Sequence, residues 1–163
     1  MNCSSHRPRA DNRAGHILRG WLCSHAPIPG VHSELPNTLK VFIVEDAIPM
    51  QIALKDLICA VTDAEIVGVV GTEAMALEWS KAHAGLWDLA IVDLTLEQGD
   101  GFNIVRRLKM EPGCGTVVVF SAFVTDVIRR HCRSLGADAV FHKTESSDLA
   151  RFVEELSGSP LAS

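Results

Sequence analysis

With 163 residues, the chain is long enough for one domain with a substantial core and too short for two ordinary domains. Its composition is 47% hydrophobic and 21% charged, with neither an apolar run near the roughly 18 residues of a membrane-spanning helix nor a secretory signal at its start, so we expect a cytoplasmic protein without a membrane segment. The net charge is -5, and residues 38–163 carry eleven basic against eighteen acidic residues, which argues against nucleic-acid binding.

The first 37 residues differ in composition from the rest of the chain. They hold four prolines and much Ser, Asn and His, and their apolar residues follow neither a period of 2 nor one of 3.6. We therefore predict a disordered leader over 1–37, one folded domain over 38–158, and a short tail over 159–163.

From residue 39 onward, short β-branched runs alternate with segments of helical length. The runs are 39–44 (LKVFIV), 64–70 (AEIVGVV), 88–94 (DLAIVDL), 116–122 (TVVVFSA) and 138–142 (DAVFH). Helices are expected over 49–60, 72–84, 101–110 and 125–135, and a last helix follows from the i, i+3, i+4, i+7 stripe of Leu149, Phe152, Val153 and Leu156. This alternation predicts an α/β fold, a (βα)5 doubly wound parallel sheet buried on both faces.

The five cysteines form no C-x-x-C pair and are odd in number, which argues against a disulfide framework and against a structural zinc site. We expect all of them to be free thiols in a reducing compartment. They are Cys3, Cys23, Cys59, Cys114 and Cys132.

Polar residues stand where four of the predicted strands end. Glu45 and Asp46 follow the first strand, Asp93 ends the third, Ser121 the fourth and Lys143 the fifth. In an open parallel sheet, ligands bind outside the carboxyl ends of the strands. One acid at a strand end is usually a solvated turn or cap residue, but five such groups on one edge indicate a site.

This edge has the chemistry of phosphoryl transfer. In a sheet of order 2-1-3-4-5 the first and third strands are neighbours, so Glu45, Asp46 and Asp93 would converge and would need a cation. Mg²⁺ suits a site of few carboxylates, water and phosphate. Asp93 would then be the nucleophile toward phosphorus, with Lys143 neutralising charge and Ser121 donating a hydrogen bond to a phosphoryl oxygen.

Four motifs make residues 39–157 resemble the receiver domain of two-component response regulators, the CheY-like superfamily. They are VFIVEDA, LAIVDLTLEQGDGF, VVVFSAF and GADAVFHK. The resemblance implies a flavodoxin-like sheet of order 2-1-3-4-5. It also implies that Asp93 is phosphorylated, and that Mg²⁺ is held by Glu45, Asp46, Asp93 and the backbone carbonyl of Thr95.

The resemblance further implies a switch made of Ser121 and Phe141. The hydroxyl would move to the phosphoryl group, and the ring would turn inward, which would repack the face of the fourth helix, fifth strand and fifth helix. The donor would be a sensor histidine kinase or a phosphotransfer protein. We expect a single-domain phosphoprotein that is not a classical enzyme and whose output is contact with a downstream protein, while a homodimer stays open.

Three positions depart from the family pattern. Glu97 and Gln98 stand where the family commonly places Pro, and Thr144 replaces the Pro that usually follows the lysine. The Lys143–Thr144 bond is therefore either trans, with Lys143 placed differently, or cis and strained by about 3–4 kcal/mol. Phe123 lies two residues after Ser121, and we hypothesise that it screens the phosphoryl group from water.

Two other functions compete with this interpretation. The first is a receiver-like interaction module that never takes phosphate. The second is a phosphatase of the haloacid dehalogenase type, which needs a second Asp two residues after the nucleophile, where this chain has Thr95. Motifs for nucleotide phosphates, G-x-G-x-x-G after the first strand or G-x-x-x-x-G-K-[ST], do not occur.

Overall fold

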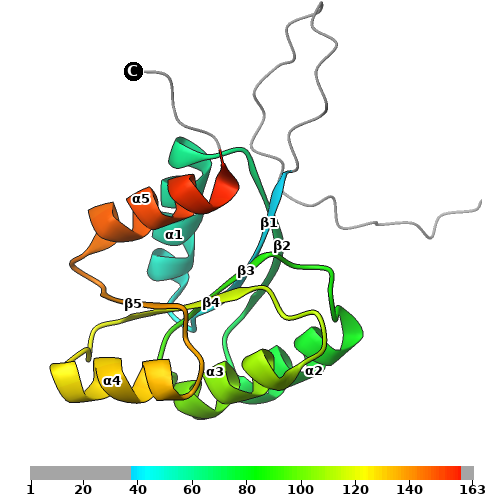
Figure 1. Cartoon of the computed structure of the whole chain (residues 1–163), viewed down its shortest axis with the longest axis vertical. Helices are drawn as coiled ribbons and strands as arrows, with labels where there is room; N and C mark the ends of the chain where they lie inside the picture. Colours follow the sequence, from blue (N-terminus) through cyan, green and yellow to red (C-terminus); the bar gives the residue numbers. More distant parts are fainter. Residues whose placement is uncertain (1–37, 159–163) are drawn as a thin grey trace, which may run out of the picture.

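The computed structural model describes residues 38–158, which form one parallel sheet with helices on both faces (Figure 1). The predicted leader, 1–37, and the predicted tail, 159–163, lie outside the described residues. Five strands alternate with five helices in this part of the chain: β1 (Leu39–Val44), α1 (Ile48–Val61), β2 (Ala64–Val70), α2 (Glu73–Ala82), β3 (Leu89–Val92), α3 (Gly101–Met110), β4 (Thr116–Ser121), α4 (Asp126–Ser134), β5 (Ala139–His142) and α5 (Ser146–Ser157).

The strand order is β2-β1-β3-β4-β5 and every pairing is parallel. This confirms the predicted flavodoxin-like (βα)5 sheet. Each predicted strand and helix is present, and the bounds differ only by a few residues at the ends. Ends are the least certain part of a sequence pattern, because the last turn or pair of an element depends on its caps and neighbours.

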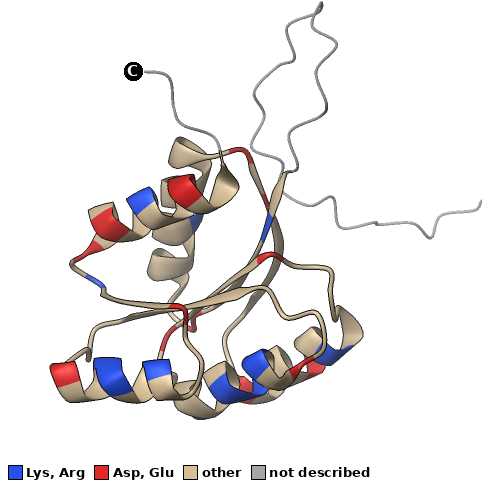
Figure 2. Cartoon of the chain, viewed as in Figure 1, with Lys and Arg blue, Asp and Glu red and all other residues tan. Residues whose placement is uncertain are grey.

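The sheet separates two hydrophobic cores. Helices α1 and α5 cover one face, and α2, α3 and α4 cover the other (Figure 1). Alternate residues of the central strands serve opposite faces, so Val41 and Ile43 join one core while Phe42 and Val44 join the other. The central strands are consequently apolar at every position, as a sheet buried on both faces requires. Charged residues stand mostly on helices and loops (Figure 2).

A stack of three rings closes the core beside the edge strand β2. The Trp79 indole lies between Phe42 and His83, with ring centroids 4.0 and 4.2 Å apart. Gly68 makes room for it, because a Cβ at this position would lie 2.6 Å from the indole. The register of β1 against β2 also shifts here, between Val41 and Phe42. The aromatic packing thus explains a glycine inside a strand.

The cysteines follow the prediction only in part. Cys114 and Cys132 carry free thiols, and burial raises the pKa of the Cys132 thiol. Cys59 is disulfide-bonded, so the prediction of five free thiols is wrong at this residue. Pairing depends on which sulfur atoms meet in space, and the spacing of cysteines along a chain does not reveal that. Cys3 and Cys23 lie outside the described residues.

Within residues 38–158, no helix is both long and apolar enough to cross a bilayer.

Candidate functional site

The register of the strands brings the predicted site residues to one edge of the sheet. Val44 pairs with Val92, so Glu45 and Asp93 each leave their strand at the same level. On the other side, Ser121 pairs with His142, and the Lys143 amide donates to the Ser121 carbonyl at 3.0 Å. The ends of β1, β3, β4 and β5 therefore surround a single space.

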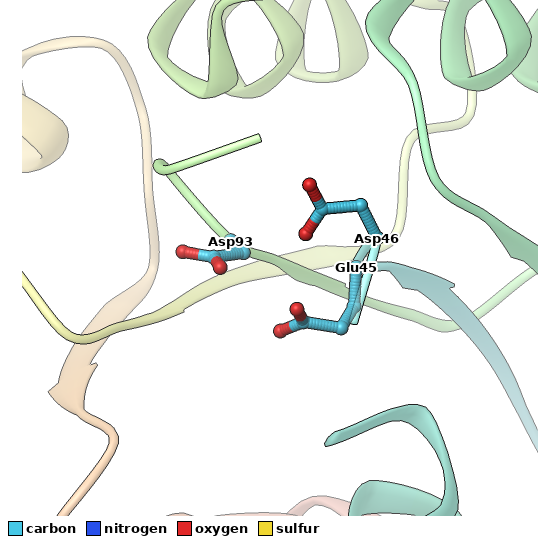
Figure 3. A group of neighbouring side chains, drawn as sticks. All are labelled: Glu45, Asp46 and Asp93. Atoms are coloured by element: carbon cyan, nitrogen blue, oxygen red, sulfur yellow. The ribbon is translucent and has the colours of Figure 1, made fainter. Parts of the chain in front are cut away.

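Three carboxylates share this space. Glu45, Asp46 and Asp93 each have an oxygen within 4.8 Å of the others, and Figure 3 shows the three side chains extending toward the same side. Glu45 is 1% exposed and Asp93 is 3% exposed. Two unit charges 4 Å apart repel by about 4 kcal/mol at an effective dielectric constant near 20, so the cluster needs positive charge.

Lys143 supplies part of that charge. Its ammonium lies 2.8 Å from a Glu45 oxygen and 2.8 Å from an Asp93 oxygen. The peptide bond after Lys143 is trans, and the lysine still reaches both carboxylates. Of the two predicted alternatives for the Lys143–Thr144 bond, trans or cis, the structure has the trans bond. Thr144 in place of the usual Pro does not displace Lys143 from the site.

Asp93 has a lowered pKa. Burial opposes its ionisation, but the Lys143 ammonium, the nearby Ser121 hydroxyl and the Thr95 amide together outweigh burial. Burial raises the pKa of Glu45, because Lys143 and the Ala47 amide compensate it only in part. Of the two buried acids, Asp93 is thus the better stabilised as an anion, which suits a nucleophile.

The Ser121 hydroxyl is fully buried beside Asp93. Although it helps to lower the pKa of Asp93, its oxygen makes no hydrogen bond of ordinary geometry with any described residue. A buried hydroxyl without a well-formed partner is uncommon. Its position is consistent with a donor whose partner is an oxygen atom brought by a ligand.

Thr95 contacts Asp93 through groups that sequence reasoning missed. Its amide donates to one Asp93 oxygen at 3.0 Å, and its hydroxyl lies 3.0 and 3.1 Å from the two oxygens. An Asp side chain often accepts from the backbone amide two residues on, an Asx-type turn, and this tendency was the available signal. The role of the Thr95 carbonyl as a metal ligand stays a prediction, because no contact within residues 38–158 tests it.

The two aromatic residues singled out from the sequence are Phe141 and Phe123. Phe141 is half-buried and packs edge-to-face on Phe152 of α5, with ring centroids 5.8 Å apart. Phe123 follows Ser121 in the β4–α4 loop and is 67% exposed. Neither position tests the switching or screening role assigned to it.

The donor set fits Mg²⁺. Carboxylate oxygens are hard ligands, and two of the three acids are buried, where water screens their charge poorly. A divalent ion would offset the repulsion that one lysine leaves uncompensated. Glu45, Asp46 and Asp93 are the residues that would hold it.

Comparison with known proteins agrees with this geometry. Residues 41–154 match the model of the response regulator receiver domain. The chain is 30% identical over 123 residues to the response regulator protein VraR of Staphylococcus aureus, an alignment that covers 74% of this chain and 57% of VraR. The chain thus spans little more than half the length of this curated relative.

Solved structures show the same fold. The phosphorylated cyanobacterial phytochrome response regulator RcpA superposes with a TM-score of 0.60 at 26% identity, covering 77% of this chain and 99% of RcpA. A chain of the CheX-CheY-BeF3-Mg²⁺ complex from Borrelia burgdorferi superposes with a TM-score of 0.64 at 18% identity, covering 72% of this chain and 88% of that one.

The ion pairs of Lys143 predict a pH-dependent stability. We expect Lys143→Met to lower the free energy of unfolding by about 1–3 kcal/mol in the absence of divalent ions, because two buried carboxylates lose their hydrogen-bond donor and counter-charge. Lys109→Met is the control, since its pair with Asp138 is more exposed and should contribute at most about 1 kcal/mol. Urea unfolding measures both.

The contribution of Lys143 to stability should depend on pH in one direction. Hydrogen bonds to Asp93 and Glu45 overcome the effect of burial and raise the pKa of Lys143 above its ordinary 10.5. While both carboxylates are ionised, its contribution is therefore complete below pH 10.5 and is lost as the pH rises through the higher folded-state pKa. An equal effect of both substitutions, or a difference from wild type that grows at alkaline pH, would contradict this.

Proposed function

The chain belongs to the response regulator receiver domain family, and we propose that it accepts a phosphoryl group on Asp93 and signals through changed protein contacts. Receiver domains of this family are signalling domains of two-component systems. The donor would be a sensor histidine kinase or a histidine phosphotransfer protein. The observation that carries the proposal is the placement of Asp93, a well-stabilised buried anion between Lys143 and two further acids.

The transfer step follows from this placement. An Asp93 oxygen forms a bond to phosphorus while the bond from phosphorus to the donor histidine nitrogen breaks, and that nitrogen keeps the electron pair. Lys143 stays beside the reacting oxygens and neutralises charge on the transferred group. The Ser121 hydroxyl would donate to a phosphoryl oxygen, which gives it the partner it lacks among the described residues.

Mg²⁺ is the proposed cofactor, and Glu45, Asp46, Asp93 and the Thr95 carbonyl would hold it. When bound, it supplies the positive charge that lets a phosphoryl group approach three carboxylates. The names of two structural relatives are in keeping with this, since one is a phosphorylated response regulator and the other complex contains BeF3 and Mg²⁺. At these identities, the likeness of the CheX-CheY chain concerns the fold alone.

Ser121 and Phe141 are the proposed switch. The hydroxyl would move toward the phosphoryl group, and the half-buried Phe141 ring would turn inward. The ring faces a cavity of about 290 Å³ lined by residues of α4, β5 and α5. Arg129 of α4 holds this face together, because it donates to the Val140 carbonyl of β5 and pairs with Glu145 at 3.3 Å. A ring movement would therefore alter the face that a downstream protein contacts.

The proposal extends to the role of the whole protein. We propose a cytoplasmic phosphoprotein whose target is another protein. A haloacid dehalogenase type of phosphatase is not proposed, because Thr95 offers a hydroxyl where that class needs a carboxylic acid. The following experiment also distinguishes the proposed phosphoacceptor from an interaction module that never takes phosphate.

Phosphorylation can be measured directly. We expect incubation with acetyl phosphate or phosphoramidate and Mg²⁺ to add one phosphoryl group to the wild-type protein, detected by intact mass, because small donors need only the acceptor and its site. Asp93→Asn should abolish the addition. Asp100→Asn is the matched control, since Asp100 lies in the same loop but caps α3 through the Phe102 amide. No addition to wild type would favour the interaction module.

If the Phe123 ring screens the phosphoryl group, the wild-type protein should lose phosphate more slowly than a variant without the ring. We expect Phe123→Ala to speed dephosphorylation of the purified protein several-fold, because water would reach the phosphoryl group more easily. Val127→Ala is the control, as Val127 is 66% exposed on α4. Decay is followed by intact mass after removal of the donor. An unchanged half-life in Phe123→Ala would refute the screening role.

A further inference from the structure

Asp46 differs from the other two acids of the site in how it is held. Glu45 and Asp93 both pair with Lys143, whereas Asp46 has no ion pair within residues 38–158. Its Oδ2 atom instead accepts a hydrogen bond of 2.8 Å from the backbone amide of Glu97. Like-charge repulsion from the neighbouring carboxylates favours rotation of Asp46 into solvent, and this amide opposes it.

The amide belongs to a loop that is fastened on its far side. The Gln98 carbonyl accepts from the Glu73 amide at 3.1 Å, and the Asp100 amide donates to the Glu73 carboxylate at 2.7 Å. Gly99 has φ +119° and passes so near Glu73 that a Cβ there would lie 2.2 Å from the Glu73 Cβ. The start of α2 thus sets the position from which Glu97 reaches Asp46.

The residue type at position 97 makes this contact available. Proline, which the family commonly places here, has no amide hydrogen and could not donate to Asp46. This chain therefore holds one acid of the cluster by a backbone donor that the usual sequence lacks. The exchange of Pro for Glu is thus more than a change in loop stiffness.

We infer that the Glu97 amide is a positioning group for the cation site: it holds Asp46 turned toward Glu45 and Asp93, and thereby couples cation binding to the order of residues 97–100. The inference rests on the proposed function, because it assumes a divalent cation at this cluster. A cation that binds the turned-in Asp46 stabilises the hydrogen bond from the Glu97 amide. By linkage, this hydrogen bond raises the affinity for the cation.

Calorimetric titration with Mg²⁺ tests the inference on three variants. We expect Glu97→Pro to bind Mg²⁺ about tenfold more weakly than wild type, because Asp46 is then turned inward in a smaller fraction of molecules. Glu97→Gln keeps the amide and removes the side-chain charge. Gln98→Pro places the same ring one residue later, where no hydrogen bond of the amide is found in the described part of the chain. Both controls should bind within about twofold of wild type.

Phosphorylation kinetics separate positioning from a general loss of structure. In Glu97→Pro the Mg²⁺ concentration for half-maximal phosphorylation by phosphoramidate should rise by about the same factor, while the rate at saturating Mg²⁺ stays near that of wild type. A fall in the saturated rate alone would mean damage to the site and would overturn the positioning role.

A measurement on the unaltered protein does not depend on any variant folding. We expect Mg²⁺ to slow hydrogen exchange of the Glu97 amide several-fold, beyond its effect on exposed amides of α4. If wild type binds Mg²⁺ but Glu97→Pro binds it equally well, or if the Glu97 amide exchanges at an unchanged rate, the inference is wrong and the proposed function stands. If wild type binds no Mg²⁺, both fail.

Discussion

The rest of the site depends on one electrostatic constraint: three carboxylates meet within 4.8 Å, and one lysine is the only basic side chain that pairs with any of them in the described part of the chain. Lys143 bridges the two buried acids, which lowers the cost of burying them. It leaves Asp46 to a backbone amide and leaves the cluster negative. A site with this balance attracts a cation and can receive a phosphoryl group only when further positive charge is present.

The fold meets this constraint by using backbone pairing to place side chains. Parallel neighbours β1 and β3 deliver their acids at one level, and β4 and β5 deliver the hydroxyl and the amine from the other side. Because the strands are buried on both faces, their register is strongly specified. The register in turn fixes the positions of the polar residues that follow the strands. The loop of residues 94–100 then adjusts how Asp93 and Asp46 are held.

Apolar runs, the alternation of strands with helices and strand-end polarity are local signals, and they were sufficient to predict the strands, every helix and the five polar groups at the strand ends. The strand order of the sheet came from the resemblance to the receiver family. The other contacts of the site and fold depend on distances between residues that a sequence pattern does not reveal. The Thr95 hydroxyl, the Glu97 amide and the Cys59 disulfide all arise from contacts fixed only by the folded backbone. Sequence reasoning recognised the missing Pro at position 97 as a departure, yet the acceptor of the freed amide, 51 residues away, became visible only in the structure.

The mutual repulsion of the acids in the absence of a cation can be measured as the free energy of unfolding of wild type and Asp46→Asn, each with EDTA and with Mg²⁺. In EDTA, Asp46→Asn should be the more stable protein by about 1 kcal/mol, because one repelling charge is gone. Mg²⁺ at ten times its dissociation constant should stabilise wild type by about 1.4 kcal/mol and stabilise Asp46→Asn much less, so that the advantage of the variant disappears. A variant that is less stable in EDTA, or equal stabilisation of both proteins by Mg²⁺, would show that the acids do not repel one another in this way.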